Sequence, residues 1–265
     1  MPDLSWRRAA AVTLKDAEHV RADPAPLIVL TLMPLLIMGF LSSAFEADLT
    51  ERYGPAPGGI AVTGAEQAVP GIAAMFCFFL VSYVGQTIFR EHGWRTWNRL
   101  RASPLRAAEL IGGRVTSTLL LALTQQTVLF AVGGALFGLH VRGSVAALAV
   151  VAVALAASMV CFGFALIAFC RSMMQLNALA YLTGLLFAGC GGGIVPYATL
   201  PLWAQALGKV TPTYWAMRGF NEAVLGGAGV GGVLLPVAVL LGLAAVFALA
   251  AWCVFRPEQV KVPWS

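Results

Sequence analysis

The chain has 265 residues, of which 59% are hydrophobic and only 11% are charged, with a formal net charge of +5. Soluble domains carry about 25% charged residues, so this composition excludes an ordinary soluble enzyme or binding module. The basic residues stand beside long apolar stretches. This pattern favours membrane lipids, and not nucleic acid, as the partner of the positive charge.

Residues 3–22 predict a helix that lies in the plane of the lipid headgroups. Trp6 and Leu14 fall on one side of a helical wheel, whereas Lys15 and Glu18 fall on the other. A soluble cytoplasmic helix is the alternative, but the tryptophan and the direct passage into an apolar stretch favour the interface. Charged residues precede that stretch, so we expect no cleavable signal peptide.

Six apolar stretches are long enough to cross a bilayer, which takes about 20 helical residues. The expected spans cover about residues 26–45, 71–89, 115–139, 143–170, 176–194 and 233–255. The polar stretch 46–66 predicts an external loop. Prolines and glycines break the segment 196–229, which predicts a re-entrant segment before the last span. The expected fold is therefore all-α, one domain over residues 1–265, with six transmembrane helices, an interfacial N-terminal helix and that re-entrant segment.

The basic residues predict the orientation of these spans. Thirteen of the 17 Lys and Arg residues fall at the chain ends, in the segment 90–114 or at Arg171, all on one side of a six-span topology. The other four, on the opposite side, are Arg52, Arg142, Lys209 and Arg218. The positive-inside rule then puts both termini in the cytoplasm. We expect a multi-pass protein of a bacterial cytoplasmic (inner) membrane.

Motifs of catalysis and nucleotide binding are missing from the sequence. It contains no GxxxxGK[ST] loop and no HExxH pair, and His19, His92 and His140 stand far apart. The five cysteines lie in apolar stretches, as small buried hydrophobes do. No ionisable residue stands deep in a span, which argues against proton- or sodium-coupled transport. We expect no catalytic residue, metal or cofactor on this chain, and an energy source on a partner.

The segment 90–111 is the densest charge cluster of the chain and predicts a cytoplasmic connection between spans two and three. Ser103 is suited to an N-cap and Pro104 to the first position of a helix. Trp94 and Trp97 stand among arginines. They either anchor in the headgroups or are buried against a partner protein, and residue chemistry leaves both interpretations open.

The segment 196–229 carries a second pattern. Thr211 and Pro212 predict the start of a helix, and Gly226 and Gly227 predict its end. Aromatic residues in this helix suit the outer membrane interface, and one acid–base pair stands a helical turn apart. The candidates for an external gate are Tyr214, Arg218 and Glu222.

These two segments resemble the type-2 permeases of ATP-binding-cassette (ABC) transporters, which include drug-resistance and polysaccharide exporters. The loop after span two of that family resembles Arg-Glu-x-x-x-Gly-Thr-x-x-x-Leu-x-x-Ser-Pro, and Arg95 stands where the family commonly has Gly. The residues that match are Arg90, Glu91, Thr96, Leu100, Ser103 and Pro104. The late segment is similar to the family's at Leu200, Pro201, Trp203, Thr211, Pro212 and Tyr214. The resemblance covers essentially the whole chain.

The resemblance implies the non-enzymatic membrane subunit of an ATP-driven exporter. A separate cytoplasmic ABC ATPase would hold ATP and Mg²⁺, and a second permease subunit, identical or a close paralogue, would complete the transporter. The cargo would be hydrophobic or amphipathic, such as a drug-like molecule, a lipid or a glycolipid, and would leave outward. A non-transporting membrane assembly or scaffold protein is the alternative.

The resemblance also implies roles for particular residues. Those expected to dock on the ATPase are Glu91, Trp94, Thr96, Trp97, Arg99, Leu100, Arg101, Ser103 and Pro104. Candidates for lining the cargo path are Phe76, Phe78, Phe79, Tyr83, Tyr181 and Phe187, for each of which plain packing is the alternative. Spans one and five, with Gly39 and the spacing from Gly189 to Gly193, are candidates for the interface between the two permease subunits.

Overall fold

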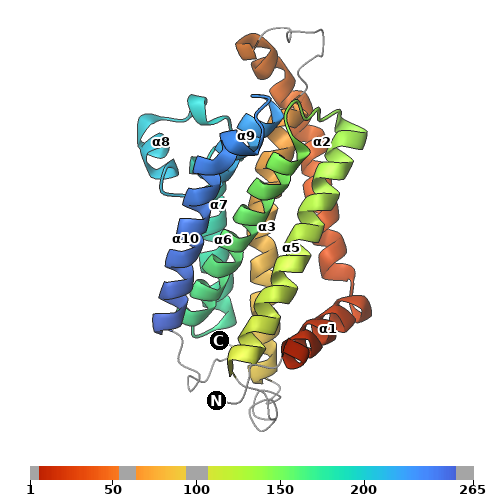
Figure 1. The fold of residues 1–265 in the computed structure, drawn as a ribbon, viewed down its shortest axis with the longest axis vertical. Helices are drawn as coiled ribbons and strands as arrows, with labels where there is room; N and C mark the ends of the chain where they lie inside the picture. The colour runs from red at the N-terminus through yellow and green to blue at the C-terminus, as the bar shows by residue number, and fades with distance from the viewer. Residues whose placement is uncertain (1–5, 54–63, 94–106, 255–265) are drawn as a thin grey trace.

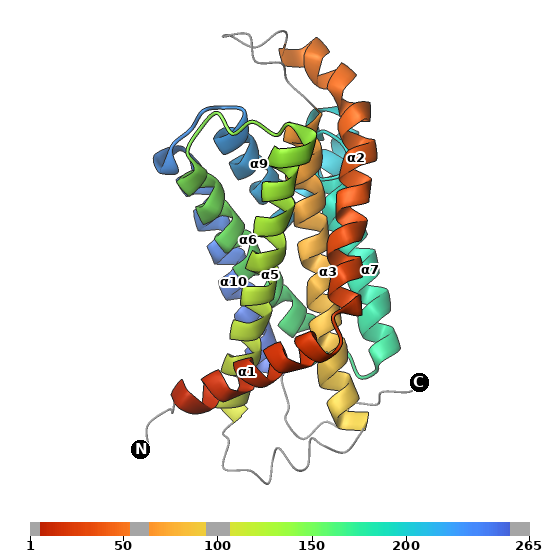
Figure 2. The same cartoon turned by 90° about the vertical axis from the view of Figure 1, so that its right-hand side faces the viewer.

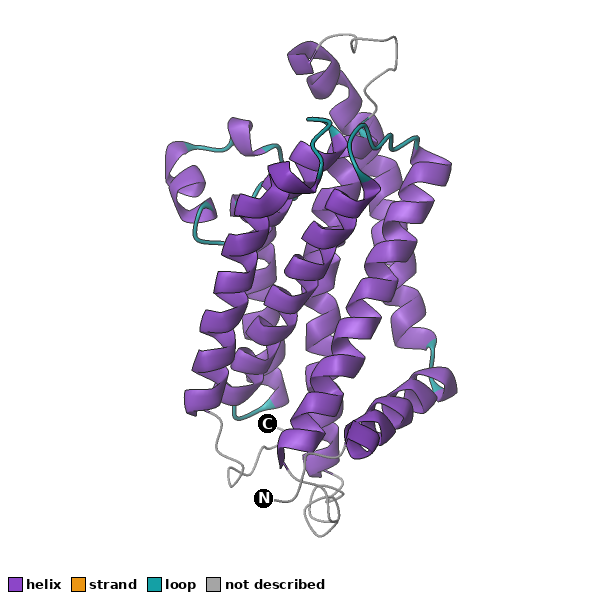
Figure 3. Cartoon of the chain, in the orientation of Figure 1, coloured by secondary structure: helices purple, strands orange, loops and turns teal. Residues whose placement is uncertain are grey.

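The computed structural model describes residues 6–53, 64–93 and 107–254, and within them every long element is a helix, with no strand (Figure 3). The fold is therefore all-α, as predicted. The helices are α1 (Trp6–Ala22), α2 (Ala25–Tyr53), α3 (Ala65–Gly93), α5 (Ala107–Phe137), α6 (Val145–Phe169), α7 (Met173–Cys190), α8 (Leu202–Gly208), α9 (Pro212–Val224) and α10 (Leu234–Val254). Two short 3₁₀ turns, Tyr197–Thr199 and Val230–Val233, precede α8 and α10.

The long helices form one bundle. The helices α2, α3, α5, α6, α7 and α10 run along its long axis, while α8 and α9 lie towards one end (Figure 1). At the opposite end α1 lies across the bundle, against the first turns of α5 (Figure 2). We call these the α9 end and the α1 end. The described chain starts and finishes at the α1 end, as an even number of passes requires.

Five helical stretches are long and apolar enough to cross a membrane. They are Ala25–Phe45, Glu109–Phe137, Val145–Phe169, Met173–Cys190 and Val230–Val254. The helix α3 adds a shorter apolar stretch, Ala65–Leu80, within its described side chains. The chain is thus a multi-pass membrane protein, and the count of six spans stays a prediction.

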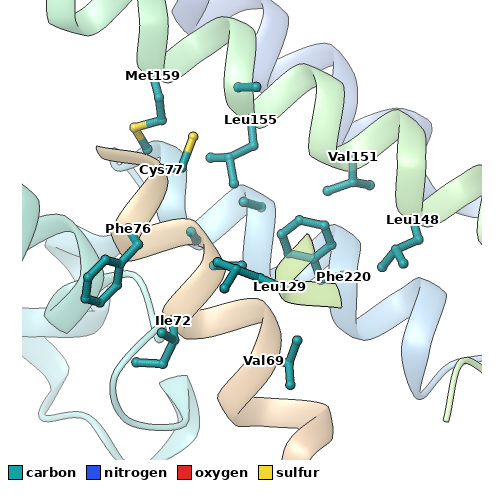
Figure 4. Close-up of a cluster of buried hydrophobic side chains, with 14 of the residues drawn as sticks. Val69, Ile72, Phe76, Cys77, Leu129, Leu148, Val151, Leu155, Met159 and Phe220 are labelled. Atoms are coloured by element: carbon teal, nitrogen blue, oxygen red, sulfur yellow. The ribbon is translucent and has the colours of Figure 1, made fainter. Parts of the chain in front are cut away.

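The core of the bundle forms around α6, which packs against α10, α9, α3 and α5. Figure 4 shows Leu155 and Met159 of α6 facing α3, with Phe220 of α9 and Leu129 of α5 beside them. All four side chains are almost fully buried. Because lipid tails are as apolar as leucine, such helices associate through close packing and not through the hydrophobic effect.

The helix α2 lies at the periphery and packs mainly against α3 and α5. Its outward side chains are apolar and exposed, with Ile28 at 57%, Leu36 at 55% and Phe40 at 78%. A soluble protein rarely leaves so continuous an apolar surface open to water. This surface suits contact with lipid or with another transmembrane helix.

The predicted external loop 46–66 is wrong in its bounds. The helix α2 continues to Tyr53, and α3 begins at Ala65. Residues 46–53 contain no Gly or Pro, so a helix that leaves the apolar region has no signal to stop before Gly54. At the other end of the loop Glu66 is fully buried within α3 and not in a polar loop.

The fifth span ends earlier than predicted. The helix α7 stops at Cys190, and residues 191–195 form turns, whereas the sequence predicted helix to about Ile194. Gly192 has a φ of +83°, a conformation that glycine adopts without steric cost. The triple glycine therefore ends the helix instead of extending it.

Candidate functional site

The proposed ATPase-docking segment falls between α3 and α5. The helix α3 ends at Gly93 and α5 starts at Ala107, both at the α1 end (Figure 2). Glu91 belongs to the last turn of α3. The other proposed docking residues lie outside the described residues; they are Trp94, Thr96, Trp97, Arg99, Leu100, Arg101, Ser103 and Pro104.

A polar cluster joins α1 to the first turns of α5. The Arg114 guanidinium forms an ion pair with the Asp16 carboxylate at 2.9 Å. The Ser117 hydroxyl donates a 2.7 Å hydrogen bond to the other Asp16 oxygen. Sequence reasoning missed this cluster, because it counted Arg114 only as a topological charge and no helical periodicity relates residues 98 positions apart.

The structure brings three of the cargo-path candidates together. The rings of Phe76 and Phe79 on α3 meet edge-to-face with centroids 5.4 Å apart. The ring of Phe79 then meets Tyr181 of α7, also edge-to-face, at 5.6 Å. Phe76 is 5% exposed and Tyr181 is 53% exposed, so this row leads from the core to the outer surface of α7. Tyr83 lies farther along α3 and is half-buried.

A second aromatic cluster lies on the neighbouring face of α3. Phe78 contacts Phe187 of α7 at 6.0 Å and Phe162 of α6 at 5.2 Å between ring centroids. Phe162 also contacts Phe247 of α10 at 4.9 Å. Gly184 makes room for this cluster, because a Cβ atom there would lie 2.7 Å from the Phe78 ring. Sequence reasoning missed Phe162 and Phe247, whose long apolar spans carry no signal of which face is turned inward.

The helix α9 begins as predicted. The Thr211 hydroxyl caps it by accepting a hydrogen bond from the Tyr214 amide, and Pro212 follows in the first turn. The Tyr214 ring packs against Tyr197 with centroids 4.6 Å apart. The Trp215 indole donates a 2.8 Å hydrogen bond to the Lys209 carbonyl. Aromatic contacts therefore tie the start of α9 to the turns before α8.

The gate candidates Tyr214, Arg218 and Glu222 share this helix but differ in surroundings. The Arg218 guanidinium lies 5.6 Å from the Trp215 ring centroid, in cation–π contact. Arg218 is exposed, Glu222 is half-buried, and these two described side chains form no ion pair with each other. Arg218 therefore packs on the Trp215 ring at the α9 end and does not pair with Glu222, although the two residues stand one helical turn apart.

The glycine turn 191–193 holds three elements together at the α9 end. The Gln67 amide of α3 donates a 2.8 Å hydrogen bond to the Gly192 carbonyl. A Cβ atom at Gly71 of α3 would overlap the Gly193 carbonyl, and one at Gly191 would lie 2.8 Å from the Tyr214 backbone nitrogen. The start of α3, the end of α7 and the start of α9 meet backbone to backbone.

The connection between α5 and α6 fastens the far end of α9. The backbone amides of Arg142 and Gly143 donate hydrogen bonds of 3.1 and 3.0 Å to the Val224 and Ala223 carbonyls. The Ser144 amide donates to the Ala228 carbonyl at 3.2 Å. Both ends of α9 are therefore fixed to the bundle by backbone contacts.

In the part of the chain that the structure describes, no group of three His, Cys, Asp or Glu side chains gathers. The described arrangement is that of a helical membrane protein with a broken segment packed at one end and a helix lying across the other. Proteins of this class include channels, transporters and membrane scaffolds.

Comparison with protein families decides among these classes. The model of the ABC-2 type transporter family matches residues 11–225. The chain therefore belongs to the ABC-2 type transporter family and is a membrane-spanning permease component. No protein of curated function matches it. The match includes α1 from residue 11 onward, the segment between α3 and α5, and α9.

Proposed function

We propose that this chain is the permease subunit of an ATP-driven exporter whose ATPase is a separate polypeptide. The family match over residues 11–225 carries the proposal, because it includes both the segment 90–111 and the helices that frame it. ATP and Mg²⁺ belong to the ATPase in this account. The permease supplies the path for the cargo, and the segment 90–111 receives the motion of the ATPase subunits.

The cargo that we propose is hydrophobic or amphipathic and leaves outward across a bacterial cytoplasmic membrane. The row Phe76, Phe79 and Tyr181 supports this, since it offers aromatic surface that begins in the core and ends on the exposed face of α7. Rings of this kind bind apolar and aromatic groups by edge and face contacts of about 0.5–1.5 kcal/mol each.

A pair of permease subunits completes the proposed transporter, with α2 and α7 as the contact helices. Both helices expose apolar side chains, including Phe40 at 78% and Leu185 at 57%. Of the glycines predicted at this interface, Gly191 and Gly193 are buried inside the subunit, whereas Gly189 is half-buried with nothing packed on it. Gly39 is half-buried and lies against Phe137 of α5. Gly189 and Gly39 therefore stay candidates for the proposed interface.

The docking proposal is tested by removing its aromatic anchors. Loss of a packed aromatic anchor costs about 2 kcal/mol or more, roughly thirtyfold in affinity. We expect Trp97→Ala, and to a similar degree Trp94→Ala, to weaken ATPase binding while membrane insertion stays normal. Trp252→Ala is the matched control, since Trp252 is 80% exposed near the α1 end of α10.

If Trp94 and Trp97 are only headgroup anchors, their alanine variants will match Trp252→Ala in pull-down and in ATP hydrolysis. That result would refute docking. If the chain recovers no ATPase at all and instead organises other membrane proteins, the scaffold function replaces the exporter.

Orientation is tested by labelling single cysteines from outside the cell. We expect reaction at positions 58 and 140 and protection at positions 102 and 259. His140 is the better external site than Gly143, because a Cβ atom at Gly143 would lie 2.5 Å from the Ala228 carbonyl oxygen. Labelling of position 102 from outside would overturn cytoplasmic termini.

A further inference from the structure

The attachment of α1 to the bundle depends on polar contacts. Asp16 and Arg114 are 14% and 8% exposed, so their ion pair is largely shielded from water. Ser117 occupies the second carboxylate oxygen, and the Thr13 hydroxyl donates a 3.1 Å hydrogen bond to the Gly113 carbonyl. We call Thr13, Asp16, Arg114 and Ser117 the α1–α5 cluster.

Apolar packing adds little to this attachment. Among the described side chains of α1, residues 10–22, Val12 is the one that is buried. Leu14 is 65% exposed, and Ala10 and Ala17 are exposed as well. The side predicted to be apolar is thus open to the surroundings, as befits a helix on a lipid surface. The face towards α5 carries Thr13 and Asp16, whereas Lys15 and Glu18, on the side predicted to be polar, are exposed as well.

The α1–α5 cluster lies between the segment that we propose to dock on the ATPase and the peripheral helix α2. Arg114 lies two turns into α5, which starts at Ala107, directly after the segment that we propose to dock on the ATPase. On the other side α1 passes into α2 through Asp23 and Pro24 alone. Hydrogen bonds from the Asp23 amide to the His19 carbonyl and from the Ile28 amide to the Pro24 carbonyl keep that passage short.

We infer that Asp16 is a positioning residue: its bond to Arg114 makes α1 move as one body with the start of α5, so that displacement of the docking segment reaches α2. A shielded ion pair with both carboxylate oxygens engaged holds a defined geometry. This inference rests on the proposed function. It assigns α1 the role of a lever between α5 and the peripheral helix α2.

The test uses the complete transporter with its ATPase, reconstituted in lipid. Asp16→Asn removes the charge at constant shape, and Glu18→Gln is the matched control on the exposed side of α1. We expect Asp16→Asn to lower the cargo moved per ATP about five- to tenfold, as loss of a coupling contact does. The amount of assembled complex stays as in wild type.

Reversal of the pair separates coupling from folding. The double variant Asp16→Arg, Arg114→Asp should restore cargo per ATP to within about twofold of wild type, because the attraction is restored. Wild-type coupling in Asp16→Asn would overturn the inference, and so would a loss of transport that merely follows a loss of assembled complex. Failure of the double variant to recover would overturn it too.

A distance measurement distinguishes this inference from the proposed function. Spin labels at Leu14 and Leu120, both exposed, report the separation of α1 and α5. We expect one narrow distance in wild type with and without ATP, and a broad distribution in Asp16→Asn. Equal distance distributions in wild type and Asp16→Asn refute the role of Asp16 even if transport is ATP-driven. A narrow wild-type distance without any ATP-dependent transport refutes the proposed exporter function alone.

Discussion

The two ends of the bundle are held together by different kinds of contact. At the α9 end the helices meet through backbone atoms, glycines and tilted aromatic rings in contact. At the α1 end the described contacts between α1 and α5 are side-chain charges and hydroxyls. Backbone contacts at glycines have one close-packed solution, whereas the ion pair joins α1 to the start of α5 alone. We infer that the α9 end moves as one block, and that α1 and the start of α5 move together as another.

The difference agrees with the direction of coupling in the proposed exporter. Motion from an ATPase enters between the end of α3 and the start of α5, next to the contacts that join α1 to α5. It then reaches α9 through the connection between α5 and α6, which binds the Ala223 and Val224 carbonyls. Three predictions test whether the α9 end is as rigid as its contacts indicate.

The largest effect is expected at Gly71. An alanine there would overlap the Gly193 carbonyl, and a backbone atom cannot move aside as a flexible side chain can. We expect Gly71→Ala to destabilise the protein by about 3 kcal/mol, the upper range for overpacking. Thermal unfolding in detergent measures it. Gly242→Ala is the control, since nothing lies near Gly242 of α10. Equal melting temperatures of the two variants would contradict the view that the α9 end is a rigid, close-packed block.

A smaller effect is expected at Gly143. An alanine there would lie 2.5 and 2.6 Å from two carbonyl oxygens and would weaken the hydrogen bonds that fasten α9. We expect Gly143→Ala to cost about 2 kcal/mol and to speed hydrogen exchange in α9. Exchange in α9 that remains at the wild-type rate would show that the connection does not hold the helix.

The smallest effect on stability is expected at Arg218. Its guanidinium is exposed and contacts one ring, so Arg218→Ala should change the free energy of unfolding by no more than about 0.5–1 kcal/mol. We expect this variant to alter transport more than folding, and Lys209→Ala, also exposed, to alter neither. Loss of the Arg218 variant from the membrane would instead assign it a structural role.

Hydropathy and helix signals predicted much of the fold. The bounds of α6 and α10 follow from uncharged stretches, and the start of α9 follows from Thr211 and Pro212, which cap it as expected. These signals are local, since each depends on residues within a few turns. The apolar stretch of α2 ends at Phe45, as predicted, but the loop was predicted to start too early because helix-forming residues continue to Tyr53.

Contacts between distant residues could not be predicted in the same way. The pairing of Asp16 with Arg114, and of Gln67 with the Gly192 carbonyl, depends on how the helices are rotated about their axes. Spans that are apolar on every side, such as α6, give no sign of that rotation. The cargo-path candidates on α3 were therefore named without Phe162 of α6, which contacts Phe78.

Native mass spectrometry of the complex, released gently from its own membrane, tests whether this permease operates with a separate ATPase. We expect a mass equal to two permease subunits with two ABC ATPase subunits. We also expect the rate of ATP hydrolysis to fall in the Trp97→Ala variant. A permease recovered without any ATPase, or one whose ATPase retains full binding and hydrolysis with the Trp97 variant, would contradict it.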